Sequence, residues 1–300
     1  MHRLKMKGQS AMEYLMTYGW AIIIIAVVLG AIYQLGFLQS FSLTPKAQPG
    51  SCSLVRPDGP LIITGEFFSG TCQGQLPETV AQFNGQSSII TVPSAINTAL
   101  NHHSFTVTAW INGAQLKELS GISDQVILGD FSPTCVTDYC LHLVVRNDFL
   151  YMGFYGDDLG GTHALNDNTW YFAAFTYDLQ TNYKNIYLNG APDNNHASGN
   201  YLQATGTYIC IGQYWACTSS GNDFNGQIAN IQIYNTSFSP SAVNSLYLEG
   251  IGGQPISPQY LVAWYPLNGN ANDYSGNGYS GNAISGISYT GVWTNAYTAP

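Results

Sequence analysis

The residues best suited to bind a metal ion are two short runs of oxygen-bearing side chains, Asp157-Asp158 and Asn222-Asp223. Carboxylate and amide oxygens on loops are the ligands that Ca²⁺ prefers. The two runs therefore make calcium a candidate ligand, while nothing in the sequence requires a cofactor. The alternative is that all four side chains are solvated turn residues.

Cysteines provide a second kind of chemistry, because an even number of them in an exported domain predicts disulfides. The simplest pairing joins sequence neighbours, and it predicts Cys52–Cys72, Cys135–Cys140 and Cys210–Cys217. Zinc is the rival, but these spacings have no histidine close by. The pair His102-His103 is expected to lie in a loop before a strand rather than to bind a metal.

The arrangements expected of a hydrolase do not occur in the sequence. It contains neither Gly-x-Ser-x-Gly nor His-Glu-x-x-His. A glycosidase needs two carboxylates roughly 5–9 Å apart. Residues 51–300 contain four glutamates, and none lies in a Glu-x-Asp-x-x-Glu arrangement on a predicted strand. We therefore predict that the protein is not an enzyme.

Aromatic side chains suggest binding instead of catalysis. The runs Tyr151–Tyr155 and Gln213–Trp215 offer rings that could stack on sugar faces, although packing of hairpins explains them equally well. Trp110 and Trp170 lie on predicted strands and are expected to be structural. The only Asn-x-Ser/Thr sequon, at Asn235, makes that residue a candidate for glycosylation.

The distribution of charge divides the chain into a basic start and an acidic body. Three of the eight Lys and Arg residues lie in the first seven positions, and the net charge is −9. Binding to duplex nucleic acid is therefore excluded, because phosphate contacts need clustered basic residues. Charged residues make up only 8% of the chain, against about 25% in an average soluble domain, a composition that suits extracellular β proteins.

The segment after the basic start has the composition of a membrane helix. No charge occurs between Glu13 and Lys46, and the 25 residues 14–38 are mostly apolar. About 20 such residues span a bilayer as a helix, and basic residues before it predict a cytoplasmic N-terminus. A secretory signal peptide fits less well, because the apolar run is too long and no small-residue cleavage site follows it.

The run from Lys7 to Tyr14, Lys-Gly-Gln-Ser-Ala-Met-Glu-Tyr, resembles the class III signal sequence of archaeal type IV pilins. The resemblance implies that a prepilin peptidase cuts between Gly8 and Gln9. It would remove residues 1–8 and leave a hydrophobic pilin-type helix over 9–38 and a linker over 39–50. It also implies a precursor in the membrane that becomes part of a cell-surface filament by packing this helix against other pilin subunits.

Glu13 is a carboxylate at the edge of an apolar helix, where an unpaired charge is costly. The pilin resemblance implies that it pairs with the new N-terminal amine, at Gln9, of a neighbouring subunit. The alternative is that Glu13 only sits among lipid headgroups. If pairing is correct, Glu13→Ala reduces filament assembly and leaves membrane insertion intact.

Beyond residue 50 the pattern is that of β-strands. In residues 104–111 Phe105, Val107 and Ala109 alternate with polar or aromatic residues, which is typical of a half-buried strand. Residues 170–178 and 227–234 repeat the pattern, and Asn189-Gly190 is a hairpin-turn signal. One helix is expected over 239–248, with Ser239 as its cap and Pro240 in its first turn.

These fragments resemble, in order, the laminin-G-like, concanavalin A-like jelly-roll family. The matching runs are 80–87, 104–111, 168–178, 186–190, 211–212, 224–228, 231–235 and 246–247. The resemblance implies that residues 51–300 form a mainly β, jelly-roll sandwich. Relatives of this kind often bind calcium at a rim of the sandwich, which agrees with the candidate runs.

Residues 261–278 look like the opening strand and turn of such a domain, yet they follow its closing helix. In the reading we favour, residues 260–300 fill the place of a permuted first strand in the same sandwich, since about 40 residues cannot bury a core alone. The alternatives are a second, truncated module and a strand inserted into a neighbouring subunit.

Two functions fit these features. The first is a pilin-like subunit whose jelly-roll head projects from the filament and binds a glycan or another cell-surface polymer. The second is a membrane-anchored, lectin-like binding protein that never polymerises. A glycan-cleaving enzyme is the least favoured reading.

Overall fold

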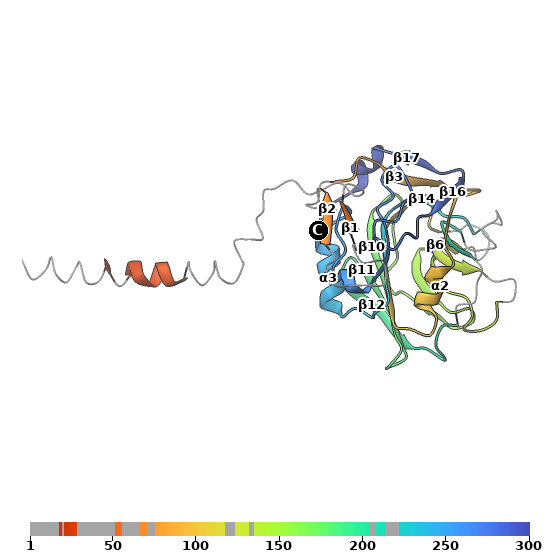
Figure 1. Cartoon of the computed structure of the whole chain (residues 1–300), viewed down its shortest axis with the longest axis horizontal. Helices are drawn as coiled ribbons and strands as arrows, with labels where there is room; N and C mark the ends of the chain where they lie inside the picture. The colour runs from red at the N-terminus through yellow and green to blue at the C-terminus, as the bar shows by residue number, and fades with distance from the viewer. Residues whose placement is uncertain are drawn as a thin grey trace, which may run out of the picture. The chain divides into compact units, whose positions relative to one another are not determined.

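The computed structural model describes residues 18–19, 21–28, 52–55, 67–70, 76–117, 124–131, 135–203, 208–213 and 222–300 (Figure 1). The chain divides into two units, Met1–Thr44 and Pro45–Pro300.

In the first unit, residues 21–28 are helical and their side chains are exposed. The cleavage site at Gly8 and Gln9, Glu13, the linker and most of the helix predicted over 9–38 lie outside the described residues. Within the described part of the chain, no helix combines the length and apolar character that a membrane crossing requires.

The second unit is built on two antiparallel sheets, which confirms the prediction of a mainly β, jelly-roll-like sandwich. In one sheet of eight strands the order is β12-β11-β10-β5-β14-β3-β17, and β15 also pairs with β14. Its strands are β3 (Val80–Asn84), β5 (Phe105–Gly113), β10 (Tyr171–Asp178), β11 (Tyr183–Leu188), β12 (Ala191–Ala197), β14 (Asn225–Tyr234), β15 (Leu261–Tyr265) and β17 (Ser288–Thr290).

The other sheet has seven strands in the order β16-β4-β13-β6-β7-β8-β9. They are β4 (Ile89–Val92), β6 (Asp124–Phe131), β7 (His142–Arg146), β8 (Phe149–Gly153), β9 (Asp158–Gly160), β13 (Tyr208–Ile211) and β16 (Asn282–Ser285). A separate two-stranded sheet pairs β1 (Cys52–Val55) with β2 (Phe67–Gly70).

The main core lies between the two large sheets. Every second side chain along a strand points into it. On β5, Phe105, Val107 and Ala109 point inward, while Trp110 points to the opposite face. On β7, Leu143 and Val145 point inward in the same way. A short helix, α2 (Ala95–Leu100), adds Ile96 and Leu100 to this core.

A second apolar cluster covers the outer face of the eight-stranded sheet. Helix α3 (Pro240–Leu248) and the 3₁₀ turn η2 (Val292–Ala296) pack there, and another turn, η1 (Pro258–Tyr260), leads into β15. The Ser239 side chain accepts a hydrogen bond from the Ala242 N–H, which confirms the predicted cap. Trp110 and Trp170 are both buried in this cluster, so they are structural, as predicted.

One strand position in the eight-stranded sheet is divided between two distant parts of the chain. The first half of β14 pairs with β3, and its second half pairs with β15 on the same flank. The two strands meet end to end where the Asn268 side chain accepts hydrogen bonds from the Thr79 N–H and hydroxyl, at 2.9 and 3.0 Å.

The last two strands of the chain, β16 and β17, each pair with a strand from the start of the sandwich, one in each large sheet. β16 pairs with β4 in the seven-stranded sheet, and β17 pairs with β3 in the eight-stranded sheet. Residues 261–265 are buried and paired within their own chain. Residues 260–300 therefore belong to the same sandwich, and the strand is not available for insertion into a neighbour.

Candidate functional site

A network of charged side chains lies on the outer face of the seven-stranded sheet. Asp124 comes from β6, His142 and Arg146 from β7, and Asp158 from β9. His142 and Arg146 alternate with the inward-pointing Leu143 and Val145, so both reach the face opposite the core.

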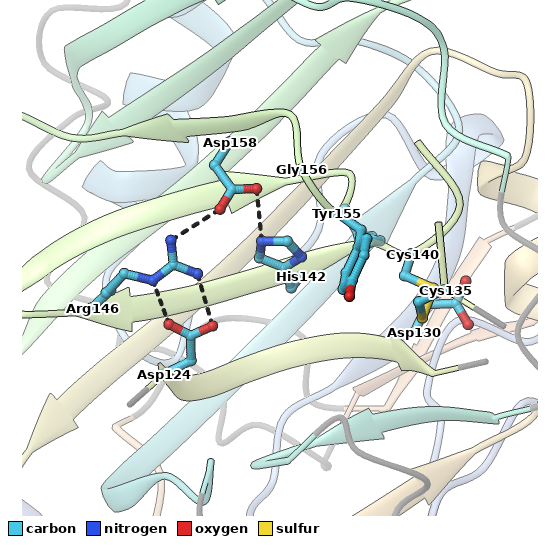
Figure 2. Close-up of a pocket in the computed structure, with 10 residues that line it drawn as sticks. Asp124, Asp130, Cys135, Cys140, His142, Arg146, Tyr155, Gly156 and Asp158 are labelled. Carbon is cyan, nitrogen blue, oxygen red and sulfur yellow. Dashed lines mark hydrogen bonds and ion pairs between the residues drawn. A yellow bond between two sulfur atoms is a disulfide. The ribbon is translucent and has the colours of Figure 1, made fainter. Parts of the chain in front are cut away.

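Arg146 connects the network (Figure 2). Its Nε and Nη2 atoms donate to the two carboxylate oxygens of Asp124, at 2.5 and 2.9 Å. Its Nη1 atom donates to Asp158 Oδ2 at 2.9 Å, and His142 Nε2 lies 3.0 Å from Asp158 Oδ1. The guanidinium also lies over the Tyr151 ring, 4.7 Å from its centre. A fork of this kind holds both carboxylates in fixed positions.

The charges in the network shift each other's titration. Burial alone would raise the pKa of Asp158, but hydrogen bonds and charges from His142 and Arg146 hold that pKa well below its ordinary value. The hydrogen bond and charge of Asp124, helped by Asp158, keep the pKa of Arg146 above its ordinary value against the effect of burial. The site is therefore a fixed ion-pair network at neutral pH.

Two glycines make room for these side chains. A Cβ atom on Gly153 would lie 2.0 Å from His142 Nε2 and 2.3 Å from Asp158 Oδ1. A Cβ atom on Gly160 would lie 2.9 Å from the Tyr151 ring. The glycines thus leave room for His142 beside β8 and for the Tyr151 ring beside β9.

A pocket of about 150 Å³ opens beside the network. The disulfide between Cys135 and Cys140 forms one wall, and Tyr155 and Gly156 form another (Figure 2). Asp130 lies next to the disulfide, and its carboxylate accepts a hydrogen bond from the Asn97 amide at 3.1 Å. Tyr155 is 45% exposed and lines the edge of the pocket.

The two candidate calcium residues Asp157 and Asp158 separate into different environments. Asp158 faces Arg146 and His142, whereas Asp157 forms an ion pair with Lys184 at 2.8 Å. An incoming calcium ion would have to displace these cations. Within the described ranges no three His, Cys, Asp or Glu side chains gather in a way that could hold a metal ion. Calcium binding stays a prediction.

The other candidate calcium run lies at the opposite edge of the network. The Asn222 side chain accepts a hydrogen bond from the Asp124 N–H at 3.2 Å, and Asp223 is buried. His102 stacks on Tyr201, with ring centres 3.8 Å apart, in the turn after α2. The structure thus brings Asn222 to the site and leaves His102 in a loop.

The two aromatic runs proposed from the sequence to stack on sugars contribute only some of their residues to the site. In Tyr151–Tyr155, Met152 and Phe154 belong to the core, whereas Tyr151 and Tyr155 are turned to the outer face and the pocket. Gln213 is buried, and the rest of that run lies outside the described residues. Asn235 is exposed directly after β14, and its glycosylation stays a prediction.

The Cys135–Cys140 disulfide is the pairing predicted from sequence proximity. Cys210 is also disulfide-bonded. Cys72, Cys217 and the side chain of Cys52 lie outside the described part, so the pairings predicted for them stay predictions.

Asp124, His142 and Arg146 were not among the predicted site residues. One signal was present in the sequence. His142 and Arg146 occupy alternate positions of His-Leu-Val-Val-Arg, a pattern that places two polar groups on one face of an otherwise apolar strand.

The two antiparallel sheets define a jelly-roll-like β-sandwich with a largely buried polar network on one outer face. The family model described as "Concanavalin A-like lectin/glucanases superfamily" matches residues 84–244, more than half of the chain. The chain belongs to this superfamily.

Solved structures show the same fold. A protein from Bacteroides ovatus ATCC 8483, described as a candidate carbohydrate-binding protein, matches with a TM-score of 0.52 and 20% identity, over 76% of this chain. This chain spans 64% of that protein's length. The heptameric SAP-like pentraxin from Limulus polyphemus matches with a TM-score of 0.50 and 14% identity, over 71% of this chain and 94% of its own. No curated protein matches the chain.

Proposed function

We propose that this protein binds carbohydrate in the pocket on the outer face of the seven-stranded sheet. The observation that carries the proposal is the combination of an exposed aromatic residue, Tyr155, with a fixed polar network at one pocket. Sugar binding needs both, because a ring face covers the apolar face of a pyranose while fixed polar groups bind its hydroxyls. Membership of a lectin superfamily supports the proposal, as does the described role of the Bacteroides protein.

The network determines what kind of sugar would be accepted. The guanidinium of Arg146 already donates to Asp124 and Asp158, and Asp130 adds another carboxylate to the lining. A carboxylated or sulfated sugar would meet these carboxylates and find the arginine occupied. The proposed ligand is therefore a neutral glycan, whose hydroxyls donate to carboxylate oxygens.

We propose further that a pilin-like N-terminal segment presents this domain at the archaeal cell surface, first in the membrane and then in a filament. The support is the basic start, the Lys7-Gly8-Gln9 run and the uncharged segment after Glu13. The alternative is a membrane-anchored lectin-like protein that does not polymerise.

Binding is tested on the full chain in mild detergent with an array of neutral and acidic glycans. Tyr155→Ala is expected to lower affinity for the best neutral glycan by about 5- to 150-fold, since a stacked ring contributes about 1–3 kcal/mol in comparable base-stacking sites. Tyr260→Ala is the matched control, because Tyr260 is 44% exposed and lies before β15. Equal losses in both variants, binding only to acidic glycans, or turnover of the bound polysaccharide would contradict the proposal.

Presentation is tested by measuring the N-terminus of the chain in isolated filaments and in membranes by mass spectrometry. A pilin starts at Gln9 and is enriched in filaments. An uncut chain confined to membranes would establish the anchored alternative.

A further inference from the structure

Lys184 is a lysine buried inside the sandwich. It lies on β11 on the same face as Ile186, and its side chain is 0% exposed. Its Nζ atom lies 2.8 Å from Asp157 Oδ1, donates to the Asp157 carbonyl oxygen at 2.6 Å, and is 4.8 Å from the centre of the Phe154 ring. Burial lowers the pKa of Lys184, although Asp157 opposes this shift. Water is thus kept from this amine, which is held against one carboxyl group.

The carboxyl group of Asp157 is polarised from its other side. Its Oδ2 atom accepts a hydrogen bond from the Ser198 hydroxyl at 2.6 Å and another from the Gly199 N–H at 2.9 Å. Burial alone would raise the pKa of Asp157, but the contact with Lys184 and these two donors lower it, so they stabilise the resting carboxylate. The two donors also stabilise the negative charge on Oδ2 when a nucleophile adds to the carbon. Oδ1, the atom that faces Lys184, is left as the leaving oxygen.

A third group, the carboxyl group of Asp138, interacts electrostatically with both Asp157 and Lys184. Burial and the negative charge of Asp157 raise the pKa of Asp138, although Asn200 and Lys184 oppose this. Its Oδ1 atom is buried and has no hydrogen-bond partner among the residues that the structure describes. Asp138 is held in place by its backbone, whose N–H donates to the Tyr155 carbonyl at 3.2 Å.

We propose that the side chains of Lys184 and Asp157 condense to an intramolecular amide. The ion pair first exchanges one proton, from Nζ to Oδ1, and the free amine then attacks Cγ while Oδ2 is held by Ser198 and Gly199. Asp138 passes a second proton from the nitrogen to Oδ1. The Nζ–Cγ bond forms, the Cγ–Oδ1 bond breaks, and Oδ1 leaves as water. Three protons on the ammonium become one on the amide and two on water, so no oxidant or reductant is needed.

The surroundings favour the product. The Lys184 charge is buried out of water and carries a large desolvation cost, and a neutral amide removes it together with the charge of the partly buried Asp157. Fixing amine and carboxyl group in contact also supplies the proximity that free condensation lacks. The bond would join the segment between β8 and β9 to β11, and so connect the two large sheets covalently.

The test is the mass of the purified, folded full chain after reduction and alkylation of its disulfides. The expected result is a deficit of one water molecule, together with a proteolytic product in which the peptides containing Asp157 and Lys184 remain linked. A full sequence mass and separate peptides would overturn the proposal.

Variants locate the bond. Lys184→Arg keeps the charge but is expected to restore the full mass, whereas Lys117→Arg, at an exposed lysine, keeps the deficit. Asp157→Asn is expected to lose ammonia in place of water and give the same linked product. Because a general acid–base group contributes about 10²–10⁴-fold, Asp138→Asn is expected to slow the mass loss by about that factor while the near-ultraviolet circular dichroism stays native. A deficit that persists in Lys184→Arg would also overturn the proposal.

Discussion

The two outer faces of the sandwich are made from the same strand pattern and have opposite characters. Trp110 on β5 and Arg146 on β7 both occupy outward positions between inward apolar residues. Over the eight-stranded sheet, α3 and η2 pack on the aromatic side chains. On the seven-stranded sheet, the corresponding positions carry an ion-pair network and a pocket. Alternation therefore specifies that a residue faces outward, and the segments that cover it decide whether that face is structural or available for binding.

The largest effect is expected on the covered face. Trp110 is 2% exposed and packs against Phe172, Tyr247 and Tyr297. Trp110→Ala is expected to lower the free energy of unfolding by about 3–5 kcal/mol, because the cavity cannot fully collapse. Urea unfolding measures this loss, and the fraction that stays folded should bind glycan with unchanged affinity.

Trp110→Phe is the control for this prediction, since it keeps an aromatic ring at the same position. It is expected to lose much less stability. A large loss of glycan affinity in the folded Trp110→Ala protein would show that the two faces are not independent.

An intermediate effect is expected on the open face. Arg146→Met removes the cation shared by Asp124 and Asp158. The Arg146 side chain is 21% exposed, so the loss should be about 2 kcal/mol, between the values for exposed and buried pairs. Glycan binding should be lost as well, because the carboxylates are no longer held. Arg146→Lys keeps the positive charge but lacks the planar guanidinium that binds two carboxylates. It should therefore restore more of the stability than of the glycan affinity. If Arg146→Met binds glycan normally, the ion-pair network is not needed for binding in the pocket.

The smallest effect is expected from pH, and it has opposite signs on the two faces. The pKa of Asp158 is lower in the folded protein than the value of about 4 in the unfolded chain, so its stabilisation is present above about pH 4 and is lost as the pH falls. Burial raises the pKa of Tyr234 on the covered face well above its ordinary value of about 10, so its stabilisation is present below about pH 10 and is lost as the pH rises.

The free energy of unfolding, measured by urea titration across pH, is therefore expected to fall at both extremes. The fall is at most about 1.4 kcal/mol per pH unit for each group. Arg146→Met should reduce the acid fall and Tyr234→Phe the alkaline fall. If Arg146→Met instead reduced the alkaline fall, or Tyr234→Phe the acid fall, the two faces would not differ in charge as described.

Much of the fold was predictable because its signals are local. The alternation around Phe105, Val107 and Ala109 and the cap at Ser239 each depend on a few neighbouring residues, and the structure contains the strand and the helix that they predict. β12 was harder to predict. Its sequence, Ala-Pro-Asp-Asn-Asn-His-Ala, has no apolar alternation, because it is an exposed edge strand held by its pairing with β11 and by polar side-chain contacts such as that of Asn194 with the Gly160 carbonyl.

The site was less predictable because its residues meet only through strand pairing. Asp124 reaches Arg146 through the register between β6 and β7, which shifts between Val126 and Leu128. Asp158 was identified from sequence as a metal ligand, whereas its cationic neighbours come from a different strand. Local patterns show which residues are charged and exposed on a strand, and they do not show which charges will face each other.

The strand position divided between β3 and β15 has a consequence for when the protein can fold. Until Leu261–Tyr265 has been synthesised, half of one flank of the central strand β14 has no partner, and β16 and β17 are made later still. Folding of the sandwich therefore has to follow synthesis, and contacts between chain ends make such folding slow. A nascent chain shorter than this exposes unpaired strand edges, which favour aggregation until the last strands have been made.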